Sequence, residues 1–230
     1  MADGLNLLTT SAAIDAAIGA RAMLKHSFYQ AWSEGRLNQA ILADYAKQYF
    51  HHVEAFPRAV SAVHTACPDR AGRRMLAENL AEEEGLGEGK SDHASLWMDF
   101  ANGLGADEEA VRAVTLNPET QGLIDAFRSL SAKSYAAGRG ALYAYESQLP
   151  AVASTKIAGL DKFYGVTDEN VIRFFTVHEA ADVEHAQVCR ELIDALPADQ
   201  RAEAMEGATK LSEALLGFLT GVEREAGMSC

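Results

Sequence analysis

The segment FFTVHEAADVEHAQ, residues 174–187, places two histidines and an aspartate at the spacing i, i+4, i+7. In an α-helix, which turns about 100° per residue, His178, Asp182 and His185 lie within about 60° of one another on one face. Phe174 falls on or near the same face, so we expect that face to be buried. Because unpaired polar groups are costly in a core, this stripe of side chains needs partners.

A metal ion is one such partner, and a hydrogen-bonded polar network or a solvated stripe is the alternative. The other acidic residues of the segment, Glu179 and Glu184, are expected to point to water. The spacing differs from that of the zinc-protease helix, which needs a histidine where Asp182 stands. The segment by itself therefore leaves both the metal site and the wet helix face open.

The remaining sequence is helical nearly throughout, since strong helix formers dominate and apolar residues recur at i, i+3, i+4 and i+7. The expected helices cover about 11–33, 38–66, 69–84, 91–103, 107–113, 118–148, 151–163, 168–196 and 198–226. Pro57 is expected to kink or divide the second of them. The sequence predicts one all-α domain over residues 1–230, a bundle of about seven to nine helices. Such bundles often build metal sites from side chains on facing helices.

Composition excludes several classes of protein. The 230 residues are 48% hydrophobic and carry a formal net charge of −13. We find no Lys/Arg cluster typical of proteins that bind nucleic acid or an anionic membrane. The apolar runs fall short of the ~20 residues that span a bilayer, and the N-terminus does not resemble a secretory signal. The three scattered cysteines, Cys67, Cys189 and Cys230, indicate reduced thiols in a cytoplasmic protein.

Further candidate metal ligands occur elsewhere in the chain. Glu146 lies near the end of an aromatic, strongly helical segment. The triplet 82–84 consists of glutamates, and glycines at 85, 87 and 89 separate it from His93. These glycines allow the chain to turn, so a glutamate before the break and the histidine after it can converge. Carboxylate and imidazole ligands without thiolate suit non-haem iron or manganese better than structural zinc.

These pieces together resemble a known family, the haem-oxygenase-like diiron oxidases. Within it the chain is similar to the CADD-like group, named after the chlamydial protein associating with death domains. The segments that carry the resemblance are HSFYQAWSEGRL (26–37), DYAKQYFHHVEAFPRAVSAVH (44–64), NLAEEEG with DHASLW (79–97), YAYESQLPAVASTKIAGL (143–160) and HEAADVEH (178–185). The resemblance implies the haem-oxygenase-like helical bundle, which is also the fold of TenA-type thiaminases and of the pyrroloquinoline-quinone synthase PqqC.

The resemblance also implies a set of metal ligands and a cofactor. The ligands would be Glu83, His93, Glu146, His178, Asp182 and His185. Glu83 is preferred because it directly precedes the Glu-Gly that ends its helix, although Glu82 and Glu84 stay open. The cofactor would be two iron ions, or one iron and one manganese ion, with O2 as co-substrate.

The activity that the resemblance implies is synthesis of para-aminobenzoate for folate, with the enzyme's own side chains as substrate. Tyr29 would supply the ring and Lys156 the amine, while Tyr45 and Tyr145 would be further redox-active aromatic residues. Phe174 stands where the related proteins carry a tyrosine, so a radical relay through that position is in doubt.

Two alternatives remain open. The diiron site could oxidise an external small molecule, such as an amino acid, a fatty acid or a cofactor precursor, because fold does not fix substrate. The chain could instead be a metal-free helical binding module. Thiamine hydrolysis is disfavoured, since Ala136, Ala137 and Gly138 stand where a thiaminase would need its cysteine. His26, His51, His52 and His64 are interpreted as structural histidines with satisfied hydrogen bonds, and a homodimer is expected.

Overall fold

The computed structural model describes residues 9–228, and within this range the side chains of residues 180–186 and 188 lie outside the described part. The described residues form eleven α-helices, one 3₁₀ turn and one π-helical turn, without a strand. Their bounds are α1 (Thr10–Ala20), η1 (Met23–Lys25), α2 (Ser27–Ser33), α3 (Gln39–Ala66), α4 (Arg70–Glu83), α5 (His93–Gly103), α6 (Glu108–Ala113), α7 (Pro118–Lys133), α8 (Tyr135–Glu146), α9 (Leu149–Gly159), η2 (Leu160–Tyr164), α10 (Glu169–Asp194) and α11 (Arg201–Glu225).

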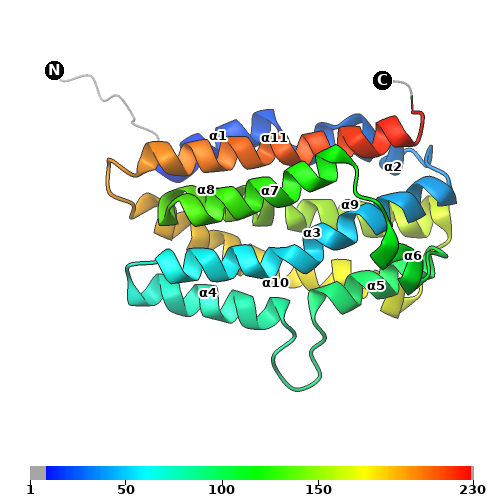
Figure 1. The fold of residues 1–230 in the computed structure, drawn as a ribbon, viewed down its shortest axis with the longest axis horizontal. Helices are drawn as coiled ribbons and strands as arrows, with labels where there is room; N and C mark the ends of the chain where they lie inside the picture. The colour runs from blue at the N-terminus through cyan, green and yellow to red at the C-terminus, as the bar shows by residue number, and fades with distance from the viewer. Residues whose placement is uncertain (1–8, 229–230) are drawn as a thin grey trace.

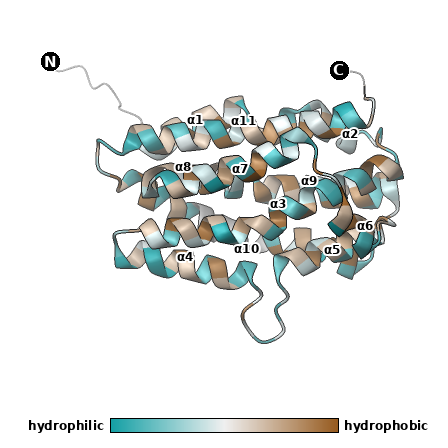
Figure 2. Cartoon of the chain, viewed as in Figure 1, coloured by the Kyte–Doolittle hydropathy of each residue, from teal (hydrophilic) through white to brown (hydrophobic). Residues whose placement is uncertain are grey.

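The long helices run along the longest axis of the molecule and form a layered bundle (Figure 1). The loop between α4 and α5 projects from one edge of this bundle (Figure 1). Hydrophobic and hydrophilic residues alternate along the helices, as an amphipathic bundle requires (Figure 2). The largest side chains that are fully buried are mostly aromatic, and they include Trp32, Tyr45, Trp97 and Tyr143.

Some predicted helices are split in the structure. The helix expected over 11–33 ends at Arg21 and begins again after His26, whose side chain accepts a hydrogen bond at the start of α2. The helix expected over 118–148 is interrupted at Ser134, whose backbone is extended and whose hydroxyl caps α8. Pro57, in contrast, does not divide α3, which runs through it as one helix. These interruptions raise the count above the predicted seven to nine helices.

Two glycines bring α8 and α11 into backbone contact. A Cβ atom at Gly140 would lie 1.9 Å from the carbonyl oxygen of Ala204, and one at Gly207 would lie 2.1 Å from that of Ala137. Every residue of α8 is buried as a result of this close packing and of its other neighbours. The last residue of this buried helix is Glu146, a carboxylate that the fold thus holds inside the bundle.

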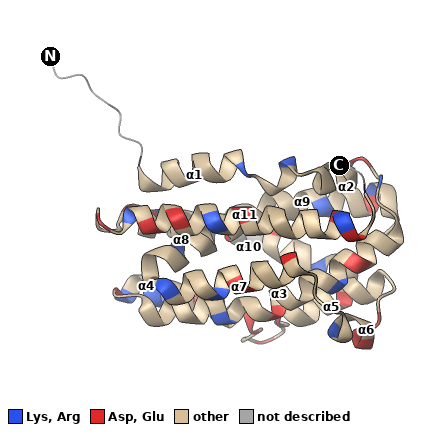
Figure 3. Cartoon of the chain, turned by 45° about the horizontal axis from the view of Figure 1, so that its top comes forward, with Lys and Arg blue, Asp and Glu red and all other residues tan. Residues whose placement is uncertain are grey.

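Acidic and basic residues are spread over many of the helices, and both signs of charge occur throughout the bundle (Figure 3). Cys67 and Cys189 are both buried, and no disulfide joins them. None of the helices in the described part of the chain is both long and apolar enough to cross a bilayer.

Candidate functional site

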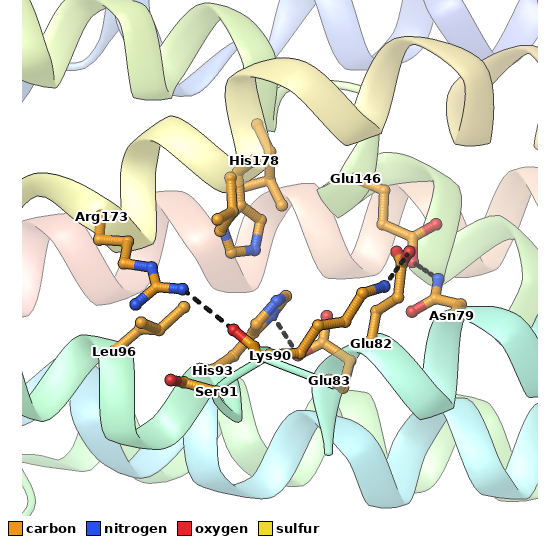
Figure 4. Close-up of a pocket in the computed structure, with 13 residues that line it drawn as sticks. Asn79, Glu82, Glu83, Lys90, Ser91, His93, Leu96, Glu146, Arg173 and His178 are labelled. Carbon is orange, nitrogen blue, oxygen red and sulfur yellow. Dashed lines mark hydrogen bonds and ion pairs between the residues drawn. The ribbon is translucent and has the colours of Figure 1, made fainter. Parts of the chain in front are cut away.

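A cavity of about 310 Å³ lies between α4, α5, α8 and α10 and contains four of the predicted ligands. Its lining includes Glu83, His93, Glu146 and His178, and Figure 4 shows these side chains converging from different helices. The other two predicted ligands, Asp182 and His185, lie outside the described residues as far as their side chains are concerned. The structure therefore brings together the described members of the predicted set.

Three of these side chains form a compact cluster. Glu83, His93 and His178 each offer a ligand atom, and these atoms all lie within 4.8 Å of one another. Oε2 of Glu83 is 2.8 Å from Nδ1 of His93, and the two imidazole rings are 4.5 Å apart between centroids. Two imidazoles and a carboxylate at this separation are a donor set that suits a divalent transition metal.

The loop between α4 and α5 explains how Glu83 and His93 meet. Glu83 is the last residue of α4, and His93 is the first residue of α5. Gly85 adopts a positive φ of 65°, and a Cβ atom there would lie 2.3 Å from the backbone nitrogen of Asp92. Only glycine permits so close a return of the chain. Asp92 then accepts a hydrogen bond from the backbone N–H of Ser95 and caps α5.

The structure distinguishes among the three adjacent glutamates. Glu83 is 8% exposed and points to His93, whereas Glu84 is exposed. Glu82 lines the rim of the cavity and forms an ion pair with Lys90 at 3.2 Å. The geometry thus favours Glu83 over its two neighbours as the candidate ligand.

The electronic state of His178 suits metal binding. Its Nδ1 lies 2.6 Å from the carbonyl oxygen of Phe174, which can only accept, so Nδ1 carries the proton. Burial, and after it the charge of the nearby His93, lower the pKa of His178 to about 3. The imidazole is therefore neutral at physiological pH, with a lone pair on Nε2 that a metal ion can accept.

Glu146 is held from both sides by neighbouring groups. It is 3% exposed; the Asn79 amide donates to Oε1 at 2.6 Å, and the Cys189 thiol lies 3.5 Å from Oε2. Burial raises the pKa of the Glu146 carboxyl, and the charge of Arg139 opposes this effect. A nearby cation would favour the ionised carboxylate in this position. Sequence reasoning had not identified Asn79 or Cys189, since neither is a distinctive metal-ligand residue in its segment.

The opening segment is otherwise arranged partly as predicted. Glu179 is exposed and accepts a hydrogen bond from the hydroxyl of Ser154, so its prediction as an outward-facing residue is confirmed. Glu184 lies outside the described side chains. Phe174 is buried and packs with its ring centroid 4.3 Å from that of His178 and 4.7 Å from that of Trp97.

The second group of predicted residues surrounds a buried lysine. Lys156 is 3% exposed, although a lysine between Thr155 and Ile157 would by default lie on the surface. Its Nζ donates to the hydroxyl of Tyr45 at 2.5 Å. Six aromatic rings have their centroids 4.8–5.8 Å from Nζ, those of Tyr29, Trp32, Tyr45, Tyr49, Trp97 and Phe175. We call this arrangement the lysine cage.

The lysine cage excludes water and affects ionisation. Burial lowers the pKa of Lys156 well below its ordinary value of 10.5. No carboxylate among the described side chains forms an ion pair with it. An ammonium ion without a counter-ion is disfavoured in such a place, so burial shifts the equilibrium of the side chain toward the neutral amine. A neutral amine has a free electron pair and is a nucleophile.

The tyrosines form a connected series around this amine. Tyr29 hydrogen-bonds to Tyr45, and the ring of Tyr45 stacks on that of Tyr49 at 5.6 Å. The hydroxyls of Tyr49 and Tyr145 are 2.8 Å apart. Tyr29, Tyr45 and Tyr145 were identified from the sequence; Tyr49 was missed, although its position one helical turn after Tyr45 could have drawn attention to it.

Trp97, also missed, connects the lysine cage to the metal candidates. It follows His93 by one helical turn on α5, and its ring lies 4.6 Å from that of Tyr49. Its indole nitrogen donates to the carbonyl oxygen of Ala46 at 2.8 Å, which fixes the ring. The two predicted groups of residues are thus neighbours in one continuous interior.

One of the structural histidines departs from expectation. His26 contacts the hydroxyl of Thr220 at 3.0 Å and His51 the carbonyl oxygen of Val111 at 3.1 Å, so both are satisfied. His52 is buried, and its Nε2 has no hydrogen-bond partner among the described residues. The interpretation of His52 as a satisfied histidine is therefore wrong, because aromatic rings rather than polar groups pack around it.

Comparison with known proteins agrees with this architecture. The model of the family described as iron-containing redox enzymes matches residues 43–220. A 4-aminobenzoate synthase of Chlamydia muridarum is 39% identical over 207 residues, which are 90% of this chain and 86% of that protein. A 4-aminobenzoate synthase of Nitrosomonas europaea is 38% identical over 221 residues, covering 91% of this chain and 89% of that protein.

Solved structures share the fold at lower sequence identity. A CADD-like protein of unknown function from Nostoc punctiforme superimposes with a TM-score of 0.78 at 19% identity, over 94% of this chain and 96% of that chain. The long identity with the synthases and the family match extend over nearly the whole bundle that holds the two groups of residues. The chain therefore belongs to the iron-containing redox enzyme family and is an oxidoreductase with the haem-oxygenase-like fold that its sequence predicted.

Proposed function

We propose that this chain is an O2-dependent dinuclear-iron 4-aminobenzoate (para-aminobenzoate) synthase that takes the ring from Tyr29 and the amine from Lys156. The observation that carries the proposal is the lysine cage, where a buried amine, whose pKa burial lowers well below its ordinary value, lies 5.7 Å from the centre of the Tyr29 ring. Relatives that are 38–39% identical bear the name 4-aminobenzoate synthase. A surface lysine could not supply a neutral amine in this way.

The residues that would hold the iron are Glu83, His93, Glu146, His178, Asp182 and His185. The donor chemistry of the described members fits, since it combines neutral imidazole and carboxylate without thiolate ligands. Glu146 gives a second reason for a metal ion at this site. Burial disfavours its ionised form, and a nearby cation would stabilise that form. Iron in this position would supply the activation of O2 and the oxidising equivalents.

The protein's own residues would then position the reacting groups. The hydroxyl of Tyr45 accepts the hydrogen bond from Lys156 Nζ and so fixes the direction of the amine. Burial favours the unprotonated amine by lowering the pKa of Lys156, and it also raises the pKa of Tyr29 far above its ordinary value, so that this phenol keeps its proton. Phe174 packs against both Trp97, a member of the lysine cage, and His178, so an aromatic contact links the cage to the cluster of metal ligands.

A second candidate is oxidation of an external small molecule at the same iron site. The cavity of about 310 Å³ beside Glu83 and His178 is the observation that favours it, since it offers room for a small substrate. The two candidates differ in stoichiometry. An enzyme that consumes Tyr29 and Lys156 yields about one product per chain, whereas an ordinary oxidase turns over many times.

The test combines product counting with mass spectrometry of the protein. The metal-free chain is loaded anaerobically with ferrous iron and exposed to O2, and 4-aminobenzoate is quantified per chain. Peptides that contain Tyr29 and Lys156 should lose mass in proportion to the product. Lys156→Met should make no product, while Lys162→Met, at an exposed lysine, should behave as wild type. Product from the Lys156→Met variant, or unchanged peptides after turnover, would refute self-consumption.

Iron binding itself is tested separately by elemental analysis, with about two iron ions per chain expected after reconstitution. The thiol of Cys67, which is in no disulfide bond, supports the proposal of a reducing, cytoplasmic location. The homodimer stays a prediction, which analytical ultracentrifugation can test.

A further inference from the structure

We propose that a second cavity, between α3 and α7, binds a monocyclic aromatic carboxylate and serves as the holding site of the product before release. The two helices lie side by side in the bundle (Figure 1). The identification of the ligand with the product rests on the proposed function. The binding site itself rests on the shape, charge and connections of this cavity.

The shape fits a single aromatic ring. The cavity has a volume of about 220 Å³, and apolar cavities of about 150 Å³ already hold a molecule the size of benzene. The rings of His52, Phe56 and Phe127 line it, and His52 and Phe127 are stacked on each other with centroids 5.1 Å apart. Such rings offer faces and edges for packing against another ring.

The charge of the cavity contrasts with that of the whole chain. Of the eleven residues that line it, two are arginines, Arg58 and Arg128, and none is acidic. Both arginines are exposed, so they lie at the mouth of the cavity. Arg128 also forms an ion pair with Asp125, at a distance of 2.7 Å. In a protein of net charge −13, a mouth with two guanidinium groups is a local attraction for an anion. Guanidinium groups bind carboxylates through paired hydrogen bonds.

The wall of the cavity contains polar atoms that a ligand could satisfy. Nε2 of His52 and Oγ of Ser131 are buried, and neither has a hydrogen-bond partner among the described residues. Burial lowers the pKa of His52 to about 3, so its ring adds no positive charge to the cavity. An amino substituent on a bound ring is a hydrogen-bond donor that either atom could accept after a small side-chain movement.

The cavity also adjoins the lysine cage. The ring of His52 lies 5.0 Å from that of Tyr49, and Nζ of Lys156 lies 5.3 Å from the same Tyr49 ring. One aromatic ring therefore separates the wall of this cavity from the amine. The first cavity is lined by three glutamates as well as by Lys90 and Arg173, whereas the second is lined by two arginines and no acidic residue and so suits an anion better. A carboxylate formed in the cage would be drawn toward the arginines.

The experiment measures binding to the full metal-free chain by isothermal titration. The probes are 4-aminobenzoate, benzoate and aniline, which separate the ring from the carboxylate. The double variant Arg58→Gln with Arg128→Gln removes the charges, Ala62→Phe fills the cavity, and Arg74→Gln is the control at an exposed arginine elsewhere. Loss of the two arginine charges should lower the affinity for 4-aminobenzoate and for benzoate about tenfold and leave the affinity for aniline unchanged. Ala62→Phe should abolish binding, with the circular dichroism spectrum showing that the variant is folded.

Equal affinity of wild type and both cavity variants would overturn the proposal, as would a wild-type chain that binds none of the probes. Ligand density beside Glu83 in a soaked crystal, with none beside Phe127, would overturn it as well. Product counting with wild-type protein tests the proposed function independently. If the aromatic carboxylates bind at Arg58 but the wild-type protein makes no product, the binding-site proposal stands and the proposed synthase function is refuted. If product forms but no carboxylate binds at Arg58, the synthase function stands and the binding-site proposal is refuted.

Discussion

Replacement of Lys156 by methionine should change how the stability of the protein depends on pH. Methionine has a similar length and no charge, so it can occupy the lysine cage without a new cavity. The pKa of Lys156 is lowered well below 10.5 in the folded state, whereas the unfolded chain holds the ammonium form up to about that pH. Folding of the wild type therefore releases a proton at any pH between the lowered pKa of the folded state and that of the unfolded chain.

The sign and the magnitude follow from proton linkage. The unfolded state binds more protons, so the free energy of unfolding of the wild type rises with pH, by about 1.4 kcal/mol per unit for one proton. The cost of deprotonation is present below pH 10.5 and fades as the pH approaches that value. Among pH 7.5, 8.5 and 9.5, the stability difference between Lys156→Met and wild type should thus be largest at pH 7.5. It should shrink by about 2.7 kcal/mol by pH 9.5.

The assay is urea denaturation of both proteins at pH 7.5, 8.5 and 9.5 in the presence of a chelator. Other titrating groups cancel in the difference between the two proteins. Lys162→Met, at an exposed position, controls for the loss of a lysine as such. Parallel stability curves for wild type and Lys156→Met would show that the folded protein keeps the ammonium ion, and the argument for a neutral amine would be refuted.

The remaining predictions concern packing and metal binding. Gly140→Ala should destabilise the protein by about 1–3 kcal/mol, seen as a lower thermal midpoint, because its Cβ would collide with Ala204. Gly217→Ala, where no atom lies within 4 Å of the new Cβ, should instead raise stability by up to about 1 kcal/mol in the same measurement. Glu83→Gln should bind markedly less iron than the wild type, as measured by elemental analysis. Glu84→Gln, at an exposed position, should bind as much iron as the wild type. Equal losses of iron in the two variants would contradict the assignment of Glu83 as the ligand.

Local periodicity was sufficient for the parts of the fold in which one helix face decides the outcome. The stripe of His178 predicted a long helix with a buried face, and α10 covers that segment with His178 6% exposed. The break at Ser134 was not predictable in the same way, because the residues on both sides favour helix and only the hydroxyl cap and the packing of α8 end the preceding helix. Glycines around residue 85 correctly indicated a turn that brings Glu83 to His93.

The lysine cage could not be derived from local sequence. The residues next to Lys156 on α9 do not indicate that it is buried. Its burial arises because aromatic residues of α2, α3, α5 and α10 meet around it. Only the resemblance to a family singled out this lysine. The prediction for His52 failed for a related reason, since the local sequence does not show that several aromatic rings will pack around this histidine.

The depth at which Tyr29 lies has a consequence for the fate of the spent protein. Its side chain is 3% exposed and fits among Phe28, Tyr45 and the amine of Lys156. Removal of a whole aromatic ring from such a core costs about 3–5 kcal/mol, a large share of the 5–15 kcal/mol that stabilises a typical domain. On the proposed chemistry, each chain would be left after its single reaction with a cavity in its core, where the ring of Tyr29 had been. The used molecule would then unfold and be degraded sooner than the fresh one, so that the cell could recognise an exhausted enzyme by its instability alone.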